Sequence, residues 1–261
     1  MSDIKDFLDT IIQGDCLEVL KTFPDKSVDL IFADEPYKIS DKGKFEIKEK
    51  SYKRVNVEWD KAIIDRIWVD ECARILKDGG AFYATGTFHN IFSLRDRFES
   101  NSSLTFRNFI TWFKPNAMPF KFACLIGLYA YSCEYVLYYT KGKTKTFNYH
   151  ELVNMNNGNQ MRDLWIIKTC QDTKTGHPTQ KPEALLSRII QANSNKGDVV
   201  LDPFMGSGTT AVEAKKLRRH FIGIELNPEY VKMANRRLNF EMLDFGEKNI
   251  KINALRRCKD E

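Results

Sequence analysis

The sequence contains few cysteines, and none lies in a metal-binding arrangement. The six cysteines include no C-x-x-C pair and no zinc-type cysteine and histidine spacing; they stand at positions 16, 72, 124, 133, 170 and 258. A chain of 261 residues can bury a core without disulfide staples. We therefore expect reduced thiols, no metal cofactor and a cytoplasmic location.

Long apolar runs and a strong net charge are also absent. No run of 18 apolar residues occurs, and residues 1–10 mix charges instead of forming the apolar core of a signal peptide. We therefore predict a soluble protein without a membrane partner. The 40 basic and 35 acidic residues leave a net charge of only +5, so contact with a polyanion must depend on local clusters of basic residues.

Short apolar runs alternate with amphipathic stretches along the chain, which is typical of strands joined by helical crossovers. This pattern predicts one α/β domain over residues 1–261, with a mixed, mostly parallel, doubly wound sheet. Helices are expected at 62–77, where Asp78-Gly79-Gly80 is the stop signal, and at 182–192. Strands are expected at 10–13, 28–33, 81–85, 107–113, 134–140, 199–202 and 220–225.

Two polar segments lack this periodicity. Residues 38–60 mix basic with acidic side chains, and residues 141–162 are rich in asparagine and contain glycines. Solvated loops are the ordinary interpretation of such segments. We predict a flexible basic loop at about 38–60 and an inserted segment at about 141–175.

A glycine-rich turn follows the predicted strand at 199–202. The turn runs from Asp202 to Thr210 into a helix, the context in which glycines let the backbone approach a ligand. It lacks the lysine of a phosphate-binding P-loop, because Thr209 directly follows Gly208, and it does not match the dinucleotide pattern. A second acid, Glu225, ends the next predicted strand and suits ribose hydroxyls. The alternative is that both acids merely cap helices.

An acid, a proline and an aromatic residue follow the predicted strand at 28–33. The tetrapeptide is Asp34-Glu35-Pro36-Tyr37, and the carboxyl ends of strands are where open α/β sheets bind ligands. By itself the tetrapeptide is better explained as an ordinary proline-containing turn, because such turns are common.

Three segments together resemble the beta group of S-adenosylmethionine-dependent DNA amino-methyltransferases. The tetrapeptide 34–37 is similar to their catalytic motif, 176–182 to a middle segment and 202–210 to their cofactor motif, in that order. The resemblance spans residues 11 to about 240. It implies a Rossmann-like methyltransferase fold and S-adenosylmethionine as cofactor.

The resemblance also implies roles for the cofactor residues. Asp202 would bind the methionine ammonium, Glu225 the ribose hydroxyls and Asp15 the adenine amino group of the cofactor. Phe204 and Pro228 would provide apolar cover, and residues 177–181 would lie near the methionine carboxylate. The full predicted set is Asp15, Cys16, His177, Thr179, Lys181, Asp202, Phe204, Gly206, Ser207, Gly208, Thr209, Glu225, Asn227 and Pro228.

The implied reaction is methylation of the N6 amino group of a flipped adenine in duplex DNA. The catalytic set is Asp34, Glu35, Pro36 and Tyr37. Asp34 and the backbone carbonyl of residue 35 would accept the amino hydrogens, while Tyr37 stacks on the base. The family pattern has a proline where this chain has Glu35. If the extra carboxylate conflicts with Asp34 or with the DNA backbone, Glu35→Pro raises turnover. If Glu35 instead takes part in recognising the target, the same substitution shifts the set of methylated sequences.

Double-stranded DNA is the expected macromolecular partner; a second copy of the chain and a cognate restriction nuclease are further candidates. The predicted phosphate contacts are Lys48, Lys50, Lys53 and Arg54. The predicted reading region contains Lys143, Lys145, Asn156, Asn157 and Arg162. Two alternatives stay open: methylation of the N4 amino group of cytosine, and a DNA-binding protein that keeps the cofactor pocket but has impaired catalysis.

Overall fold

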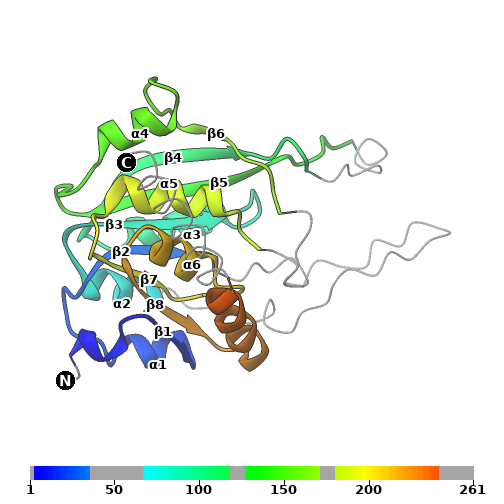
Figure 1. Ribbon diagram of the computed structural model, residues 1–261. Helices are drawn as coiled ribbons and strands as arrows, with labels where there is room; N and C mark the ends of the chain where they lie inside the picture. Colours follow the sequence, from blue (N-terminus) through cyan, green and yellow to red (C-terminus); the bar gives the residue numbers. More distant parts are fainter. Residues whose placement is uncertain (1–2, 36–66, 118–126, 171–179, 241–261) are drawn as a thin grey trace, which may run out of the picture.

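The computed structural model describes residues 3–35, 67–117, 127–170 and 180–240 (Figure 1). The centre of the fold is an eight-stranded sheet with the order β1-β8-β7-β2-β3-β5-β4-β6. The strands are β1 (Thr10–Gln13), β2 (Val28–Ala33), β3 (Leu76–Gly86), β4 (Leu104–Phe113), β5 (Cys133–Lys141), β6 (Leu164–Ile166), β7 (Val199–Asp202) and β8 (His220–Glu225). The helices are η1 (Ile4–Phe7, a 3-10 helix), α1 (Cys16–Leu20), α2 (Ile67–Ile75), α3 (Ile91–Glu99), α4 (Tyr149–Met155), α5 (Glu183–Asn193), α6 (Thr209–Lys216) and residues 228–240.

Strand direction divides the sheet into two parts. The neighbours from β1 through β8, β7 and β2 to β3 are all parallel. β5 runs antiparallel to both β3 and β4, and the short β6 is parallel to β4. The prediction of a mixed, mostly parallel α/β sheet is confirmed. We call the edge where β1, β2, β3, β7 and β8 end the carboxyl edge, and the opposite one the amino edge.

Alternate residues of the central strands face two separate cores, as expected for a doubly wound sheet. In β2, Ile31 and Ala33 join the core beneath α1, α2 and α3. Leu30 and Phe32 join the core beneath α5 and α6. Because both faces are covered, the strand is apolar almost without interruption.

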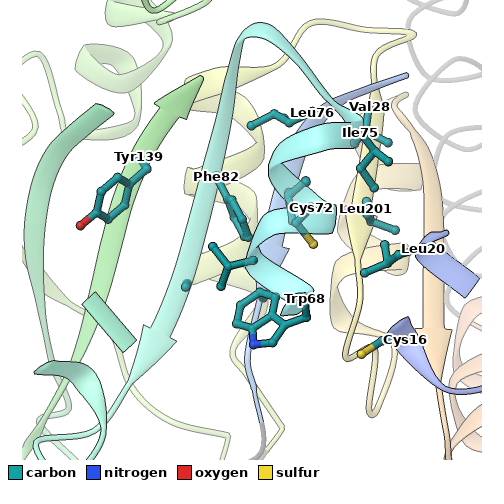
Figure 2. Packing of buried hydrophobic residues seen from close by; sticks show 14 of the residues in the cluster. Cys16, Leu20, Val28, Trp68, Cys72, Ile75, Leu76, Phe82, Tyr139 and Leu201 are labelled. Carbon is teal, nitrogen blue, oxygen red and sulfur yellow. The ribbon is translucent and has the colours of Figure 1, made fainter. Parts of the chain in front are cut away.

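The first core contains large aromatic side chains beside small thiols (Figure 2). Trp68 and Cys72 of α2 pack with Phe82 of β3 and Leu201 of β7, and all four side chains are fully buried. The Trp68 ring meets the Phe82 ring nearly edge-on, with centroids 5.9 Å apart. No helix within the described ranges is long and apolar enough to cross a membrane.

The helix predicted at 62–77 was wrong at its C-terminal end. Its first residues, 62–66, lie outside the residues that the structure describes. α2 ends at Ile75 and β3 begins at once with Leu76. Asp78-Gly79-Gly80 therefore belongs to the strand, where the β2–β3 register shifts. Gly79 has a φ of +80°, and its carbonyl accepts a hydrogen bond from the Lys145 backbone N–H at 3.1 Å. Glycines in a strand mark such irregularities as well as helix ends.

The polar segment at 141–162 has more order than the sequence predicts. α4 forms within it, because the Asn148 N–H donates to the Ala192 carbonyl at the end of α5, at 2.8 Å. β6 follows and adds an outermost strand to β4. η1, α1, α3 and the helical residues 228–240 were likewise not predicted. The predicted strands and the predicted helix at 182–192 lie within a few residues of their observed bounds; Pro182 precedes α5 as its N-cap.

Candidate active site

Three acidic side chains stand at neighbouring points of the carboxyl edge. Asp34 directly follows β2, Asp202 ends β7 and Glu225 ends β8, and these three strands are adjacent and parallel. Burial, and to a lesser extent the charges of Asp34 and Glu225, raise the pKa of Asp202 to about 7. The acids therefore lie close enough to influence one another, as predicted from their positions at strand ends.

Asp202 is held by its own turn. Its side chain is only 2% exposed and accepts hydrogen bonds from the Thr210 hydroxyl, at 2.5 Å, and from the Phe204 backbone N–H, at 2.9 Å. These two donors favour the charged carboxylate, but burial outweighs them. A buried carboxylate of this kind is stabilised when a cationic ligand arrives.

Glu225 ties the glycine-rich turn to β8. Its two carboxylate oxygens accept the backbone N–H groups of Gly206 and Asn227, each at 2.8 Å. Burial raises the pKa of Glu225, while these N–H groups act in the opposite direction. The carboxylate still has free lone pairs, since it can accept about four hydrogen bonds. Predicted cofactor residues are thus joined directly, and Pro228 follows at the start of the helical residues 228–240.

Gly208 is required at its position by both conformation and space. Its φ is +82°, and a Cβ added there would meet the Ala234 Cβ at 2.8 Å. The neighbouring Ser207 and Thr209 are buried. The Thr209 hydroxyl accepts a hydrogen bond from Arg237 at 2.7 Å and donates to the Lys181 carbonyl at 3.2 Å. The turn is therefore fixed to the segment that precedes α5.

Asp15 and Cys16 reach the same edge through β1. The Gly14 N–H donates to the Glu225 carbonyl at 3.0 Å, which places the start of α1 beside the end of β8. Asp15 caps α1 by accepting the Leu17 N–H at 2.9 Å. Cys16 is buried, and burial raises the pKa of its thiol to about 12. Cys16 therefore contributes shape and not a nucleophile.

The Asp34 carboxylate is held from two sides. The Thr85 hydroxyl, near the end of β3, donates to one oxygen, and the Lys181 ammonium donates to the other at 2.5 Å. Lys181 also lies 3.6 Å from Glu134, which is paired with Lys114 at 2.9 Å. Burial lowers the pKa of Lys181, but Asp34 and Glu134 outweigh it and raise the pKa overall. Asp34 thus faces a charged lysine.

Sequence reasoning assigned Lys181 to the cofactor carboxylate and missed its partners. The structure places its ammonium on Asp34, at the junction of the predicted catalytic and cofactor residues. Thr85 ends a predicted strand, and that position was a usable signal. Glu134 and Lys114 gave no such signal, because only the antiparallel pairing of β4 with β5 brings them together.

Glu35 is buried and paired with α3. The residue is 6% exposed, and both carboxylate oxygens accept hydrogen bonds from the guanidinium of Arg97 on α3. Burial raises the pKa of Glu35, the ion pair with Arg97 lowers it, and Asp34 contributes the smallest of the named effects. The expected conflict between the two neighbouring carboxylates is therefore small.

Several predicted site residues lie outside the described ranges. They are the catalytic Pro36 and Tyr37, the cofactor residues His177 and Thr179, and the phosphate contacts Lys48, Lys50, Lys53 and Arg54.

The structure does not bring the predicted reading residues together. Lys143 and Lys145 are exposed at the amino edge, where they line a hollow of about 550 Å³ with Asp78. Asn156 is the C-cap of α4, and the exposed Asn157 follows it. The exposed Arg162 precedes β6, whose first pairing is with Thr111 near the carboxyl end of β4.

An exposed aromatic cluster lies at the carboxyl edge and was also missed. Phe88 and Tyr131 are each half exposed, and their rings stack with centroids 5.8 Å apart. His89 lies 5.5 Å from the Tyr131 ring. Phe88 follows the end of β3 and Tyr131 precedes β5, so antiparallel pairing joins two segments far apart in sequence.

Comparison with known proteins identifies the class to which this site belongs. The sequence model of the N6/N4 methyltransferase family, described as DNA methylase, matches residues 28–236. The match includes Asp34, Asp202 and Glu225. The chain belongs to this family of DNA methyltransferases and is an enzyme of that class.

Individual relatives cover most of the chain. It is 38% identical to the Type II methyltransferase M.HinfI of Haemophilus influenzae over 254 residues, covering 90% of this chain and 70% of the relative. It is 38% identical to the Type II methyltransferase M2.MboI of Moraxella bovis over 249 residues, covering 90% and 89%.

Solved structures agree with the fold. The M1.HpyAVI–SAM complex has 32% identity and a TM-score of 0.66 over 88% of this chain and 98% of that one. The cytosine-N4-specific PvuII DNA methyltransferase, at 19% identity, has a TM-score of 0.67 over 86% and 84%. The latter likeness shows the fold alone.

Proposed function

We propose that this protein transfers a methyl group from S-adenosylmethionine to the N6 amino group of a flipped adenine in duplex DNA. One observation carries the proposal: Asp34 and Asp202 end adjacent parallel strands, and the Asp202 carboxylate is buried there with a raised pKa. In this arrangement Asp34 can accept hydrogens from the amino group that is methylated, while Asp202 binds the cationic methyl donor beside it.

The described side chains fit S-adenosylmethionine. Asp202 offers a buried carboxylate for an ammonium, and Glu225 retains lone pairs for hydroxyls while it holds Gly206. The similarity of the chain to the M1.HpyAVI–SAM complex, with 32% identity over 88% of this chain, supports the same cofactor. When bound, this cofactor supplies a methyl group already activated by a positive sulfonium. The protein must therefore contribute orientation rather than activation of the leaving group.

Asp34 is the proposed acceptor for the target amine. Thr85 and Lys181 fix the direction of its two oxygens, and the backbone carbonyl of residue 35 is the second acceptor. Holding both amino hydrogens leaves the nitrogen lone pair directed at the methyl group. The Lys181 ammonium donates a charge-assisted hydrogen bond to one of these oxygens, which fixes its direction as well as its distance.

The choice of adenine over cytosine depends on Asp34. Related cytosine enzymes more often begin the tetrapeptide with serine, so the carboxylate favours adenine. Two relatives at 38% identity are named only as Type II methyltransferases, which is compatible with either base. The base is therefore the first quantity to measure.

The DNA-binding face is proposed to be the carboxyl edge. The exposed rings of Phe88, His89 and Tyr131 lie there, and aromatic rings stack on unpaired bases with about 1–3 kcal/mol each. A base leaving the duplex toward Asp34 would pass close to these rings. Lys143 and Lys145, at the amino edge, are not part of this proposed face.

The test is product analysis. Wild-type protein is incubated with methyl-labelled S-adenosylmethionine and a library of duplexes, and the digested DNA is analysed by mass spectrometry. N6-methyladenine supports the proposal, whereas N4-methylcytosine would reassign the base. DNA binding without transfer would instead favour the binding-protein alternative. Asp34→Asn, which keeps size and removes the charge, is the control for background transfer.

A further inference from the structure

Glu35, the residue after the proposed catalytic Asp34, is anchored to a different element of the fold. Arg97 Nη1 donates to Oε2 of Glu35 at 2.8 Å, and Nη2 donates to Oε1. The Glu35 side chain is 7% exposed and that of Arg97 20%. Paired hydrogen bonds of this kind fix direction as well as distance. The backbone at residue 35 is thereby tied to α3.

α3 is a rigid anchor. Its residues Ile91, Leu94 and Phe98 are fully buried, and the Phe98 ring packs against Phe82 with centroids 4.6 Å apart. At its start, a Cβ on Gly86 would meet Ile91 at 2.9 Å, so the end of β3 and α3 are in close contact. Arg97 is therefore held in a fixed relation to β3.

The same unit holds Asp34 from the other side. Thr85, which donates to the Asp34 carboxylate, precedes Gly86 at the end of β3. β3 and α3 thus position Asp34 through Thr85 and position residue 35 through Arg97. Two consecutive residues that are proposed to accept the two hydrogens of one amine are fixed by one structural unit.

Removing the two charges of this pair from water costs free energy, which suggests that the pair has a role beyond stability. Burial raises the pKa of Glu35, while Arg97 and the Trp68 side chain favour its charged form. A buried ion pair often adds little to stability compared with apolar residues, but removal of one partner leaves an uncompensated charge. The resemblance places a proline at this position, and a proline fixes φ through its ring. Glutamate has no ring.

We propose that Glu35 and Arg97 form a positioning pair. This external restraint performs the task of the proline ring and holds the residue 35 carbonyl in the direction needed for the target amine. The inference rests on the proposed function. Glu35 and Arg97 contact neither cofactor nor base in this account and act through the backbone beside Asp34.

The decisive measurement is the single-turnover rate of methyl transfer at saturating cofactor and DNA. We expect Glu35→Gln and Arg97→Met each to lower this rate about 10- to 100-fold, because small misplacements of reacting groups have effects of this size. Cofactor Kd should change less than about 3-fold, because Asp202 and Glu225 keep their contacts. The double variant should be no slower than the worse single variant, because both changes break one interaction.

A rescue separates positioning from loss of folding. Glu35→Pro alone removes the carboxylate that pairs with the partly buried Arg97 guanidinium and should be slow. Glu35→Pro combined with Arg97→Leu restores a backbone restraint and also removes the guanidinium that has lost this carboxylate, so its rate should return to within about 5-fold of wild type. Arg95→Met is the matched control: Arg95 lies on the same helix, is 47% exposed and contacts the Phe106 ring. It should leave the rate unchanged.

The outcomes distinguish this inference from the proposed function. Transfer by wild type with equal rates in folded Glu35→Gln and Arg97→Met, each verified by circular dichroism, overturns the inference alone. Additive losses in the double variant, or failure of the proline and leucine variant to recover while folded, also overturn it. Absence of transfer by wild type overturns both the proposed function and the inference.

Discussion

The two edges of the sheet differ in how they hold charge. At the carboxyl edge the acids are buried or nearly so, and Asp202 has a pKa raised to about 7 by burial. At the amino edge the ion pair of Lys26 with Asp78 has side chains 57% and 66% exposed, and Lys143 and Lys145 are exposed as well. Charges at the carboxyl edge therefore interact strongly with neighbouring groups, whereas water and salt screen the charges at the amino edge.

Strand direction explains which predicted residues converge. Acids that follow adjacent parallel strands lie at the same edge of the sheet, and Asp34, Asp202 and Glu225 all lie at the carboxyl edge. Lys143 and Lys145 follow β5, which runs antiparallel to β3, so they emerge at the amino edge. A basic segment is therefore placed by the direction of the strand before it and not by its closeness in sequence to a motif.

The largest expected effect comes from removing one charge at the carboxyl edge. Asp34→Asn should lower methyl transfer about 10²- to 10⁴-fold, the range typical of a positioned proton-accepting side chain, with cofactor Kd changed less than about 3-fold. Asp29→Asn is the matched control on the same strand at the amino edge, where Asp29 bonds Lys77 and the Val199 N–H. Turnover is measured for both variants after each is shown to be folded. An equal loss of methyl transfer in Asp34→Asn and Asp29→Asn would show that the carboxyl edge has no special role.

The next largest effect concerns cofactor affinity. Asp202→Asn should weaken S-adenosylmethionine binding by about 2–5 kcal/mol, as is typical when one partner of a buried charge pair is lost. Calorimetry measures this directly. Wild-type affinity should rise as pH increases from about 5.5 to 7.5, because Asp202 must lose its proton to pair with an ammonium, and an α-amino group stays charged to about 7.7. An affinity independent of Asp202 would place the ammonium elsewhere.

The raised pKa of Asp202 predicts an opposite trend for stability without cofactor. Between the ordinary aspartate pKa of 3.8 and the raised pKa of about 7, the folded protein keeps a proton that the unfolded chain releases. The free energy of unfolding of wild type, relative to Asp202→Asn, should therefore fall as pH rises through this window, by up to about 1.4 kcal/mol per pH unit. Urea titrations at several pH values provide the comparison. A difference that does not vary with pH would mean that Asp202 is not buried.

The smallest effect is expected at the amino edge. Replacing both Lys143 and Lys145 by alanine should change DNA affinity less than about 2-fold, because these side chains lie away from the proposed DNA face. The salt dependence of binding is the sharper measurement. The slope of the logarithm of the binding constant against the logarithm of salt concentration is compared with that of wild type. If its magnitude falls by about 0.9 for each lysine removed, the lysines contact phosphates, and the DNA must extend to this edge.

Sequence reasoning succeeded where local patterns determine structure. The strand, acid and glycine turn at 199–210 fixed the place of Asp202, and the strand at 28–33 fixed that of Asp34. It failed where partners come from elsewhere. α4 depends on hydrogen bonds to the end of α5, and β6 depends on pairing with β4. Both arise from tertiary contacts that no window of residues contains.

Glu35 illustrates the same limit within the candidate site. From the sequence, it is an added charge next to Asp34, and its replacement by proline is expected to raise turnover. Arg97 stands 62 positions away and has no local signal to link it to Glu35. With this partner present, we expect Glu35→Pro alone to lower turnover, because the substitution removes the carboxylate that pairs with the partly buried Arg97 guanidinium.

The adjacency of β2 and β7 has a consequence for synthesis of the protein. Asp29 and Val199 bond across these strands although 170 positions separate them, so the candidate site joins segments that are far apart in the sequence. A nascent chain can complete neither β7 nor β8 until residues 199–225 have left the ribosome. Fragments separated at Gly158 would each lack half of the site, and restoration of methyl transfer on mixing them would report directly on the joining of β2 to β7.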